Sequence, residues 1–217
     1  MHPLTLNIPK PMVRVCDKNL IEHNFWKLPK EVDEVIIVVH YLSEQIINHF
    51  GEEFHGKKIT YVRQKKLLGT GHALFACKEY LKNTDRFIVM MADDIYGEND
   101  IKNAVKKEGN VLTVKKINGK FRGGNVIFDQ SNILKDIKEG IHKGKKSFVN
   151  VGFYILSPEI FNYDLVKIEN SKEYGLPQTI IKMTDEYKIN IVEFKEWFQV
   201  VDMVDIKILK RKLCKKR

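Results

Sequence analysis

Two adjacent carboxylates, Asp93 and Asp94, follow an apolar run at residues 87–91 after the single residue Ala92. Such a run is typical of a strand buried in a parallel sheet, and it puts both carboxylates at the carboxyl end of that strand. Open α/β sheets bind their ligands at that edge. Paired carboxylates offer hard oxygen ligands, which suit Mg²⁺ carrying phosphates. A solvated turn is the alternative for this pair taken alone.

A glycine motif stands upstream of the carboxylates. Gly69 and Gly71 flank Thr70 just before a helical pattern, and glycine lets backbone N–H groups approach an acceptor such as a base edge or a phosphate. Gln64 ends the preceding strand pattern, and its amide donates and accepts together, which suits a nucleobase edge. A plain loop would also explain the glycines, but the combination in this order indicates a nucleotide site.

Three further polar residues stand where a ligand could reach them. Lys10 lies between Pro9 and Pro11, which stiffen a cation suited to phosphate; a surface lysine in a proline turn is the alternative. Asn150 lies inside an apolar strand near a glycine, where a ligand could approach closely or where a structural amide would serve. Asp202 precedes the last helix and is either a helix cap or a ligand.

The elements that must position these residues alternate between strands and helices. Strand patterns at 34–40, 59–64 and 86–91 enclose helical patterns at 42–50 and 67–81. This order predicts successive βαβ units and therefore a parallel sheet. Two prolines exclude a helix from residues 3–12, which we predict to be a loop. A short strand at 13–16 and a helix at 19–28 are expected next.

The second half of the chain has a different texture. Alternating patterns at 123–129 and 133–138 predict a small β-meander laid against the core. The strong strand at 148–156 is followed by a helix that Ser157 and Pro158 begin. Further elements are expected as helices at 98–107, from just after Pro177 to about Tyr187, and at 204–213, and as strands at 111–115, 189–194 and 198–201.

The composition predicts one globular domain. The chain has 217 residues, of which 43% are hydrophobic and 30% charged, enough for one core and too few for two. No apolar run approaches membrane-spanning length and no signal-peptide core is present, so we expect a cytoplasmic protein without a membrane partner. The three scattered cysteines, Cys16, Cys77 and Cys214, are interpreted as packing residues and not as a disulfide framework or a zinc site.

The net charge of +9 raises the question of nucleic acid. Much of the excess lies in Lys143, Lys145 and Lys146 and in the tail at 210–217, without the interleaved aromatics of an RNA-binding signature. A solvated lysine-rich surface explains this charge, and basic residues facing a cleft would equally attract polyanionic small substrates. We therefore expect no specific nucleic-acid partner.

In this order the pieces resemble the sugar-1-phosphate nucleotidylyltransferases, which make nucleotide sugars. The segment LGTGHAL with Gln64 upstream is most similar to the uridylyltransferases that act on N-acetylglucosamine 1-phosphate. The resemblance covers essentially the whole chain. It implies an α/β fold, a Rossmann-like three-layer sandwich with a mostly parallel sheet (the nucleotide-diphospho-sugar transferase fold) plus the small β-meander. The residues that carry it are PLTLNIPKPMVRV, Gln64, LGTGHAL, ADDIYG, Gly124, Glu139, VNVGFYILSPEIF, Glu173-Tyr174 and Val201-Asp202.

The resemblance also implies a reaction and its residues. The phosphate of a sugar 1-phosphate would attack the α-phosphorus of an NTP, with UTP favoured, and release pyrophosphate without a protein nucleophile or base. Mg²⁺ would assist as cofactor. By position, Lys10 would bind phosphate, Gln64, Gly69 and Thr70 would read the base, Asp93 and Asp202 would hold the metal, and Gly124, Glu139, Asn150 and Glu173 would contact the sugar phosphate.

The sequence departs from the family in three places. Members begin with a strand and a glycine-rich loop ending in Gly-Thr-Arg, and the 217 residues open after that point, so the expected single domain at 1–217 is N-terminally truncated. That loop supplies N–H groups and an arginine to the triphosphate. A nucleotide-sugar-binding or regulatory module is therefore the alternative, and thymidylyl, guanylyl or phosphocholine cytidylyl transfer and homo-oligomerisation stay open. Ala92 replaces the usual glycine, and Lys138-Glu139-Gly140 leaves the sugar-phosphate lysine unassigned.

Overall fold

The computed structural model describes residues 1, 4–144 and 146–214. Lys145 and the last three residues of the basic tail lie outside these ranges. The chain divides into two compact units: unit 1 comprises Met1–Arg63, Met91–Ile101 and Glu196–Arg217, and unit 2 comprises Gln64–Met90 and Lys102–Lys195. The single domain at 1–217 stays a prediction.

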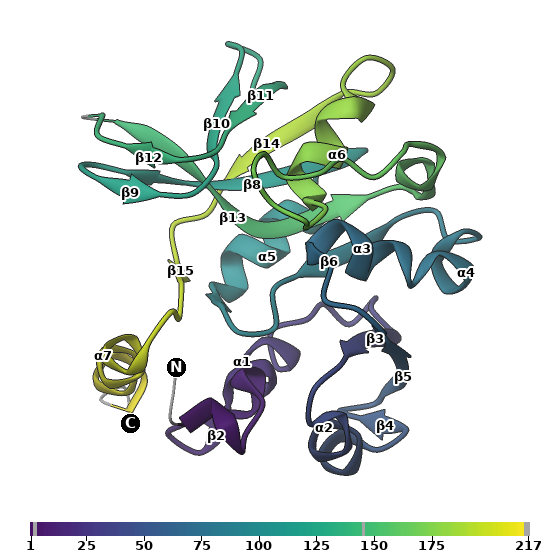
Figure 1. Ribbon diagram of the computed structural model, residues 1–217, viewed down its shortest axis with the longest axis vertical. Coiled ribbons are helices and arrows are strands. Elements are labelled where there is room, and N and C mark those ends of the chain that lie inside the picture. Colours follow the sequence, from purple (N-terminus) through teal and green to yellow (C-terminus); the bar gives the residue numbers. More distant parts are fainter. Residues whose placement is uncertain (2–3, 145, 215–217) are drawn as a thin grey trace. The chain divides into compact units, whose positions relative to one another are not determined.

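Unit 1 contains a βαβ unit, as predicted. Strand β3 (Glu34–Val39) pairs parallel to β5 (Lys57–Arg63), and α2 (Ser43–Phe50) connects them (Figure 1). Helix α2 ends at Gly51, whose φ of 60° suits a helix C-terminus. The short strand β4 (Glu53–Phe54) adds antiparallel to β5. One core joins these elements to α1 (Leu20–Phe25) and consists of Ile21, Phe25, Ile37, Val39, Ile46, Phe50 and Ile59.

The rest of unit 1 joins the first and last segments of the chain. Helix α1 (Leu20–Phe25) follows the β1–β2 hairpin, α7 (Met203–Leu213) packs on β1, and β7 pairs antiparallel with β15. A second core holds them together: Val13, Val15, Leu20, Ile95, Val200, Ile206 and Leu209. The strands are β1 (Arg14–Val15), β2 (Lys18–Asn19), β7 (Ile95–Tyr96) and β15 (Trp197–Phe198).

Two predictions for unit 1 are corrected by the structure. Residues 3–12 were expected as a plain loop but contain two 3₁₀ turns, η1 (Leu4–Leu6) and η2 (Lys10–Met12). Pro11 stands in the first turn of η2, where a missing N–H costs nothing. The helix expected at 19–28 is shorter, because Asn19 caps α1 and the helix ends at Phe25.

Unit 2 is built on a six-stranded mixed sheet in the order β11-β10-β13-β8-β14, with β6 also paired to β13. Strand β13 (Ser147–Leu156) runs antiparallel to β6, β8 and β10, whereas β14 is parallel to β8. Because β6 and β8 both oppose β13, they run in the same direction as β14. The other strands are β6 (Phe87–Met90), β8 (Asn110–Ile117), β10 (Asn125–Phe128), β11 (Leu134–Lys138) and β14 (Ile189–Glu193).

The stretch from β5 to β6 does not form a βαβ unit of one sheet. Strand β5 lies in the three-stranded sheet of unit 1, whereas β6 lies in the six-stranded sheet of unit 2. The predicted parallel partner of β6 is replaced by β13, which pairs with it through Leu156↔Phe87 to Phe153↔Met90. The apolar pattern of residues 86–91 predicted strand β6 correctly. It carried no information about which strand β6 pairs with.

The predicted meander is confirmed, since β10 and β11 pair antiparallel. A second hairpin pairs β9 (Phe121–Arg122) with β12 (Ile141–His142). The helix expected after Ser157 is the 3₁₀ helix η3, and the helix expected at 67–81 is divided into α3 and α4. The helices are α3 (Gly69–Phe75), α4 (Lys78–Leu81), α5 (Glu98–Val105), η3 (Pro158–Asn162) and α6 (Leu176–Met183).

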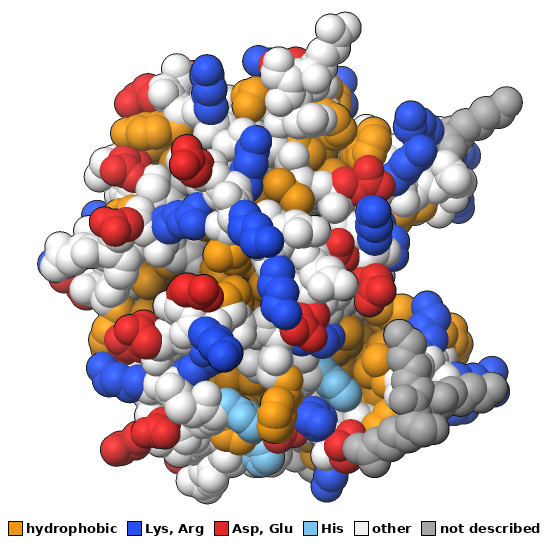
Figure 2. Space-filling model, turned by 180° about the vertical axis from the view of Figure 1, so that it is seen from behind, with side chains coloured by type: hydrophobic (Ala, Val, Ile, Leu, Met, Phe, Trp, Pro, Cys, Tyr) orange, Lys and Arg blue, Asp and Glu red, His pale blue; other side chains and the backbone are white. Residues whose placement is uncertain are grey.

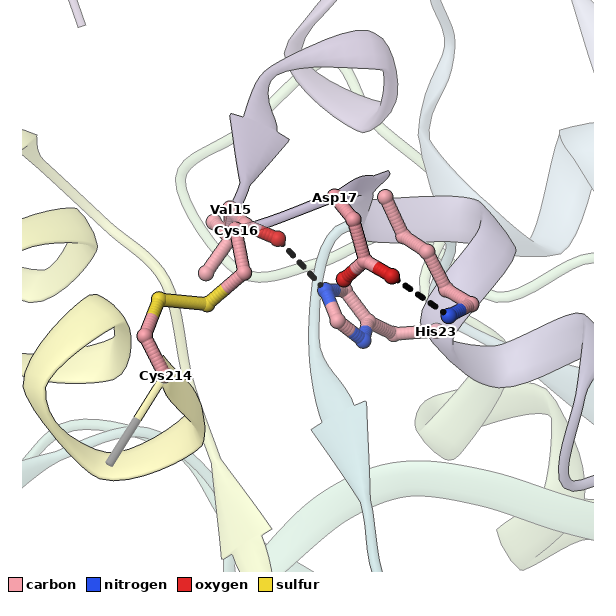
Figure 3. The surroundings of a disulfide bond; sticks show 6 residues. Val15, Cys16, Asp17, His23 and Cys214 are labelled. Carbon is pink, nitrogen blue, oxygen red and sulfur yellow. Dashed lines mark hydrogen bonds and ion pairs between the residues drawn. A yellow bond between two sulfur atoms is a disulfide. The ribbon is translucent and has the colours of Figure 1, made fainter. Parts of the chain in front are cut away.

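A disulfide between Cys16 and Cys214 corrects the interpretation of the cysteines (Figure 3). The two residues are 198 positions apart and meet because α7 packs on β1. Cys77 fits the packing prediction: it is buried and free, and burial raises the pKa of its thiol to about 11. A recess of about 370 Å³ beside the disulfide is lined by Cys16, Asp17, Lys18, His23, Leu213 and Cys214, and holds none of the predicted site residues.

The surface gives two further observations. On the face drawn in Figure 2, lysine and arginine side chains are interspersed with acidic ones, as a solvated charged surface requires. Within the ranges that the structure describes, no helix combines the length and the apolar character needed to cross a bilayer.

Candidate functional site

The predicted phosphate and metal residues all lie in unit 1. Lys10 Nζ is 2.6 Å from Asp93 Oδ2, and the two side chains are 31% and 32% exposed. Lys10 opens η2, and Met12 N donates to Pro9 O at 2.8 Å, so the proline segment holds the lysine on a turn. The structure therefore brings together a cation and a carboxylate that are 83 positions apart, and both remain accessible to a ligand.

Asp94 has a different environment from its neighbour. It is 6% exposed, and its Oδ2 accepts a hydrogen bond from Trp197 Nε1 at 3.0 Å. Val200 N donates to Oδ1 at 3.4 Å, and Asn24 Nδ2 donates to the Asp94 backbone oxygen at 2.7 Å. Burial, followed by the nearby Asp93 carboxylate, raises the pKa of Asp94 to about 7. A solvated turn fits Asp93 alone, because Asp94 points inward.

Asp202 caps α7, which confirms the structural alternative for this residue. Its Oδ1 accepts hydrogen bonds from Val204 N at 2.7 Å and Asp205 N at 3.1 Å. Asp205 completes the capping box, since its Oδ2 accepts from Val201 N and Asp202 N. The cap leaves Asp202 exposed, and its role as a metal ligand stays a prediction.

The donor chemistry of Asp93 and Asp202 fits a hard cation. Among the described residues no three His, Cys, Asp or Glu side chains gather as a complete protein cage. Mg²⁺ does not need such a cage, because it is usually held by one or two carboxylates together with substrate phosphates and water. The ion pair engages Oδ2 of Asp93 and the cap engages Oδ1 of Asp202. The other oxygen of each accepts no hydrogen bond from the part of the chain that the structure describes.

The glycine motif lies in unit 2 and packs more tightly than the sequence indicated. Gly69 and Gly71 stand in the first turn of α3 and not in a loop before it. Gly69 has φ of 90°, and a Cβ added there would lie 2.5 Å from Tyr174 O and 2.9 Å from Glu173 Cβ. Gly71 N donates to Tyr174 O at 2.9 Å. The expectation of a bare N–H is wrong for Gly71; these glycines allow close contact with the segment before α6.

Gln64 and Thr70 are tied into the same cluster. Gln64 is 6% exposed, and its Nε2 lies 3.0 Å from His72 Nδ1 and 3.3 Å from Gly69 O. Since an amide nitrogen can only donate, Nδ1 of His72 is the acceptor in this contact. Thr70 Oγ1 accepts from Leu176 N at 3.1 Å, at the start of α6. His72 thus has a structural partner in Gln64.

The predicted sugar contacts also lie in unit 2 and meet near the start of α6. A Cβ on Gly124 would lie 2.9 Å from Glu139 Oε1, and Asn150 N donates to Gly124 O at 2.9 Å. Gln178 Nε2, in the first turn of α6, donates to Glu139 Oε1 at 3.2 Å. Glu173 lies against Gly69 at the other end of this cluster.

Asn150 has a structural role in the bulge of β13. Its Nδ2 donates to Tyr154 Oη at 2.7 Å, and Gly152 N donates to Asn150 Oδ1 at 3.1 Å. The register with β8 shifts between Asn150 and Tyr154, and Gly152 has φ of 73°. Sequence reasoning missed Tyr154 and Gln178. The glycine inside the strand was the available signal for the bulge, but nothing in the sequence paired Gln178 with Glu139.

Comparison with known proteins assigns this arrangement to a family. The family model described as nucleotidyl transferase matches residues 1–198. The chain belongs to the nucleotidyl transferase family. Solved structures share its fold: a putative glucose-1-phosphate thymidylyltransferase from Bacillus anthracis has a TM-score of 0.84 over 98% of this chain and 89% of its own, at 19% identity. A UDP-glucose pyrophosphorylase complexed with UDP-glucose has a TM-score of 0.79 over 100% and 94%, also at 19% identity. The predicted α/β fold is confirmed.

The curated relatives of this nucleotidyl transferase differ in length and in name. The D-glycero-α-D-manno-heptose 1-phosphate guanylyltransferase of Campylobacter jejuni is 33% identical, over 85% of this chain and 86% of the relative. The UTP–glucose-1-phosphate uridylyltransferase AglF of Haloferax volcanii is 30% identical, over 83% and 76%. The bifunctional protein GlmU of Methanocaldococcus jannaschii is 28% identical over 93% of this chain and 48% of its own length, so the chain spans about half of that relative.

Proposed function

We propose that this nucleotidyl transferase moves a nucleotidyl group from an NTP, with UTP favoured, to a sugar 1-phosphate, giving an NDP-sugar and pyrophosphate. The observation that carries the proposal is the 2.6 Å pair of Lys10 and Asp93, which supplies a phosphate-binding cation and a metal-binding carboxylate at one place. Relatives named as guanylyltransferase and uridylyltransferase support an enzyme over a non-catalytic binding module.

Lys10 would exchange its partner when substrate arrives. An ion pair whose two side chains are both partly exposed contributes little to stability, so Nζ can leave Asp93 for a phosphate oxygen at small cost. When bound, Mg²⁺ would neutralise phosphate charge and align the attack. Asp93 and Asp202 would hold it. No protein nucleophile or general base is needed, because the attacking phosphate is ionised at neutral pH.

The unit 2 cluster would bind the other parts of the substrates. Gln64, Gly69 and Thr70 would face the base, while Gly124, Glu139, Asn150 and Glu173 would contact the sugar phosphate. The close packing of Gly69 on Tyr174 O and of Gly124 on Glu139 supports a preorganised surface. One relative is named as a guanylyltransferase and another as a uridylyltransferase. GTP is therefore the main alternative to UTP as the nucleotide substrate.

The test is a panel of UTP, GTP, dTTP and CTP against sugar 1-phosphates, scored by pyrophosphate release that requires both substrates. Asp93→Asn and Lys10→Met should each reduce kcat/KM by about 100-fold or more, because the first removes a charged oxygen that would hold Mg²⁺ and the second removes a cation that would bind phosphate. Lys58→Met, which breaks an exposed pair with Glu34 in the same unit, is the matched control and should keep its activity. Unchanged turnover in Asp93→Asn would contradict the assignment.

The remaining expectations concern place and assembly. We propose a cytoplasmic enzyme with no nucleic-acid or membrane partner. Sedimentation at several protein concentrations would decide whether it forms a homo-oligomer.

A further inference from the structure

We infer that Asp94 is a positioning residue, whose buried carboxylate holds the segment leading to Asp202 against the segment that carries Asp93. The metal part of this inference rests on the proposed function. All the residues concerned belong to unit 1. The family resemblance assigns the metal to Asp93 and Asp202 and gives Asp94 no role, but the contacts of Asp94 give it a task of its own.

The two segments already run side by side through a short ladder. Strands β7 and β15 pair antiparallel with Ile95↔Phe198 and Tyr96↔Trp197. Gly97 N donates to Glu196 O at 2.6 Å, which extends the contact on one side. Continuing the register on the other side would put Asp94 opposite Gln199, where the ladder has ended. Beyond this point the two segments can be held together only by side-chain contacts.

The Asp94 carboxylate provides these contacts. Its Oδ1 accepts a hydrogen bond from Val200 N at 3.4 Å, and its Oδ2 accepts one from Trp197 Nε1 at 3.0 Å. The carboxylate is thus hydrogen-bonded to the opposite segment at two residues, Trp197 within β15 and Val200 beyond it. Val200 is 0% exposed in the core with Val13, Val15 and Ile95. Asp202 follows two residues later and is fixed by its capping box with Asp205.

A carboxylate suits this position better than an amide. Burying a carboxylate costs free energy unless hydrogen bonds compensate for the lost water, and here both oxygens accept from N–H donors. An asparagine would present its NH₂ group to one of those donors and lose that bond. On the other side, Asn24 Nδ2 holds the Asp94 backbone oxygen at 2.7 Å. Residues that orient metal ligands in this way typically change metal affinity when they are replaced.

The test compares Asp94→Asn and Trp197→Phe with the wild type in the full chain. Trp197→Phe keeps an aromatic ring and removes one donor, so it serves if the Asp94 variant folds poorly. The readout is Mn²⁺ affinity in the presence of UTP, measured by electron paramagnetic resonance. We expect about 10- to 100-fold weaker binding in both variants. Tyr61→Phe, which loses the 2.6 Å bond to Gly51 O in the same unit, is the matched control and should bind Mn²⁺ as the wild type does.

The outcomes separate this inference from the proposed function. If the wild type releases pyrophosphate and both variants bind Mn²⁺ normally, Asp94 is only structural and the inference is overturned. If Tyr61→Phe weakens Mn²⁺ binding as much as Asp94→Asn does, general destabilisation explains the effect and the inference is likewise overturned. If the wild type binds Mn²⁺ with UTP but transfers nothing, the proposed reaction fails, and selective loss of Mn²⁺ in the two variants still supports the positioning role.

Discussion

Cys16, in the turn between β1 and β2, is joined to Cys214 at the end of α7 (Figure 3). A cross-link between distant residues restricts the unfolded chain and typically adds about 2–4 kcal/mol to the free energy of unfolding. We predict that dithiothreitol lowers the free energy of unfolding of the wild type by about that amount, which is seen as a lower urea midpoint. Cys214→Ser should show the lower midpoint with and without the reductant.

The control for this prediction is Cys77→Ala, whose midpoint should respond to dithiothreitol as the wild type does, because Cys77 is free. If dithiothreitol leaves the urea midpoint of the wild type unchanged, the two sulfurs are not joined in the purified protein. The proposed cytoplasm keeps most thiols reduced, so thiol trapping in fresh cell extract would also report which state the cell maintains.

Gly69 should resist substitution for two reasons that can be measured separately. Its φ of 90° is unfavourable for a side chain, and an added Cβ would lie 2.5 Å from Tyr174 O. Gly56 shares the positive φ, at 67°, but has no atom within 4 Å of an added Cβ. We predict a loss of about 1 kcal/mol for Gly56→Ala and a further 1–3 kcal/mol or so for Gly69→Ala, from overpacking.

Urea unfolding of the two alanine variants provides the comparison, with each slope checked against the wild type. Equal losses would mean that the Tyr174 backbone moves aside, and the steric explanation of the Gly-Thr-Gly motif would then be wrong. A larger loss at Gly69 would confirm that the motif serves packing, whatever its part in binding a base.

Lys27 gives the stability of the protein a specific dependence on pH. Burial lowers the pKa of Lys27 from 10.5 to about 8, although Glu196 and Glu98 oppose the shift. Between these values the unfolded chain holds a proton that the folded chain has released. The free energy of unfolding therefore rises with pH through this window, by up to about 3 kcal/mol. Below pH 8 the cost of burying the charged amine is fully present.

Lys27→Met isolates that contribution. The variant loses the 2.6 Å hydrogen bond from Lys27 Nζ to Tyr96 O but avoids burying a charge, so at pH 7 we predict a stability close to that of the wild type. Between pH 8 and 10.5 the free energy of unfolding of the wild type should increase relative to that of Lys27→Met. Denaturant titrations at half-unit steps measure the difference, and a constant difference would contradict the lowered pKa.

Local features of the fold could be predicted from the sequence because their causes are local. The end of α2 at Gly51 and the Asp202 cap of α7 need only a few neighbouring residues. The βαβ unit of β3 and β5 follows from periodicity and chain connectivity. In the site, the same reasoning found Lys10 and Asp93 as chemical types, but only the structure shows that they touch.

Features that depend on distant partners could not be predicted. The pairing of β6 with β13 joins residues more than sixty positions apart, and the disulfide joins residues 198 apart. Neither leaves a periodic signal in the sequence. The separation of Asp93 and Asp94 into an exposed and a buried carboxylate has the same origin, because Trp197 and Val200 reach Asp94 from the far end of the chain.

Asp202 is assigned two tasks, and Asp205 allows them to be separated. Asp202→Ala removes the cap from α7, which should cost about 1 kcal/mol, and also removes the proposed metal ligand. Asp205→Ala breaks the other half of the same box, the bonds from Val201 N and Asp202 N, but leaves the Asp202 carboxylate in place. Both variants should therefore lose similar stability in urea, while only Asp202→Ala should raise the Mg²⁺ concentration needed for half-maximal pyrophosphate release, by about tenfold or more.

Asp202→Asn completes the set, because asparagine both caps a helix and offers a neutral oxygen to a metal. It should keep the stability of the wild type and show an intermediate Mg²⁺ requirement. If Asp205→Ala shifted the Mg²⁺ requirement as far as Asp202→Ala does, the effect would come from fraying of α7, and Asp202 would be a helix cap without a part in metal binding. If only Asp202→Ala shifts it, the cap and the ligand are one carboxylate using different oxygens, which is the arrangement that the Oδ1-only capping bonds allow.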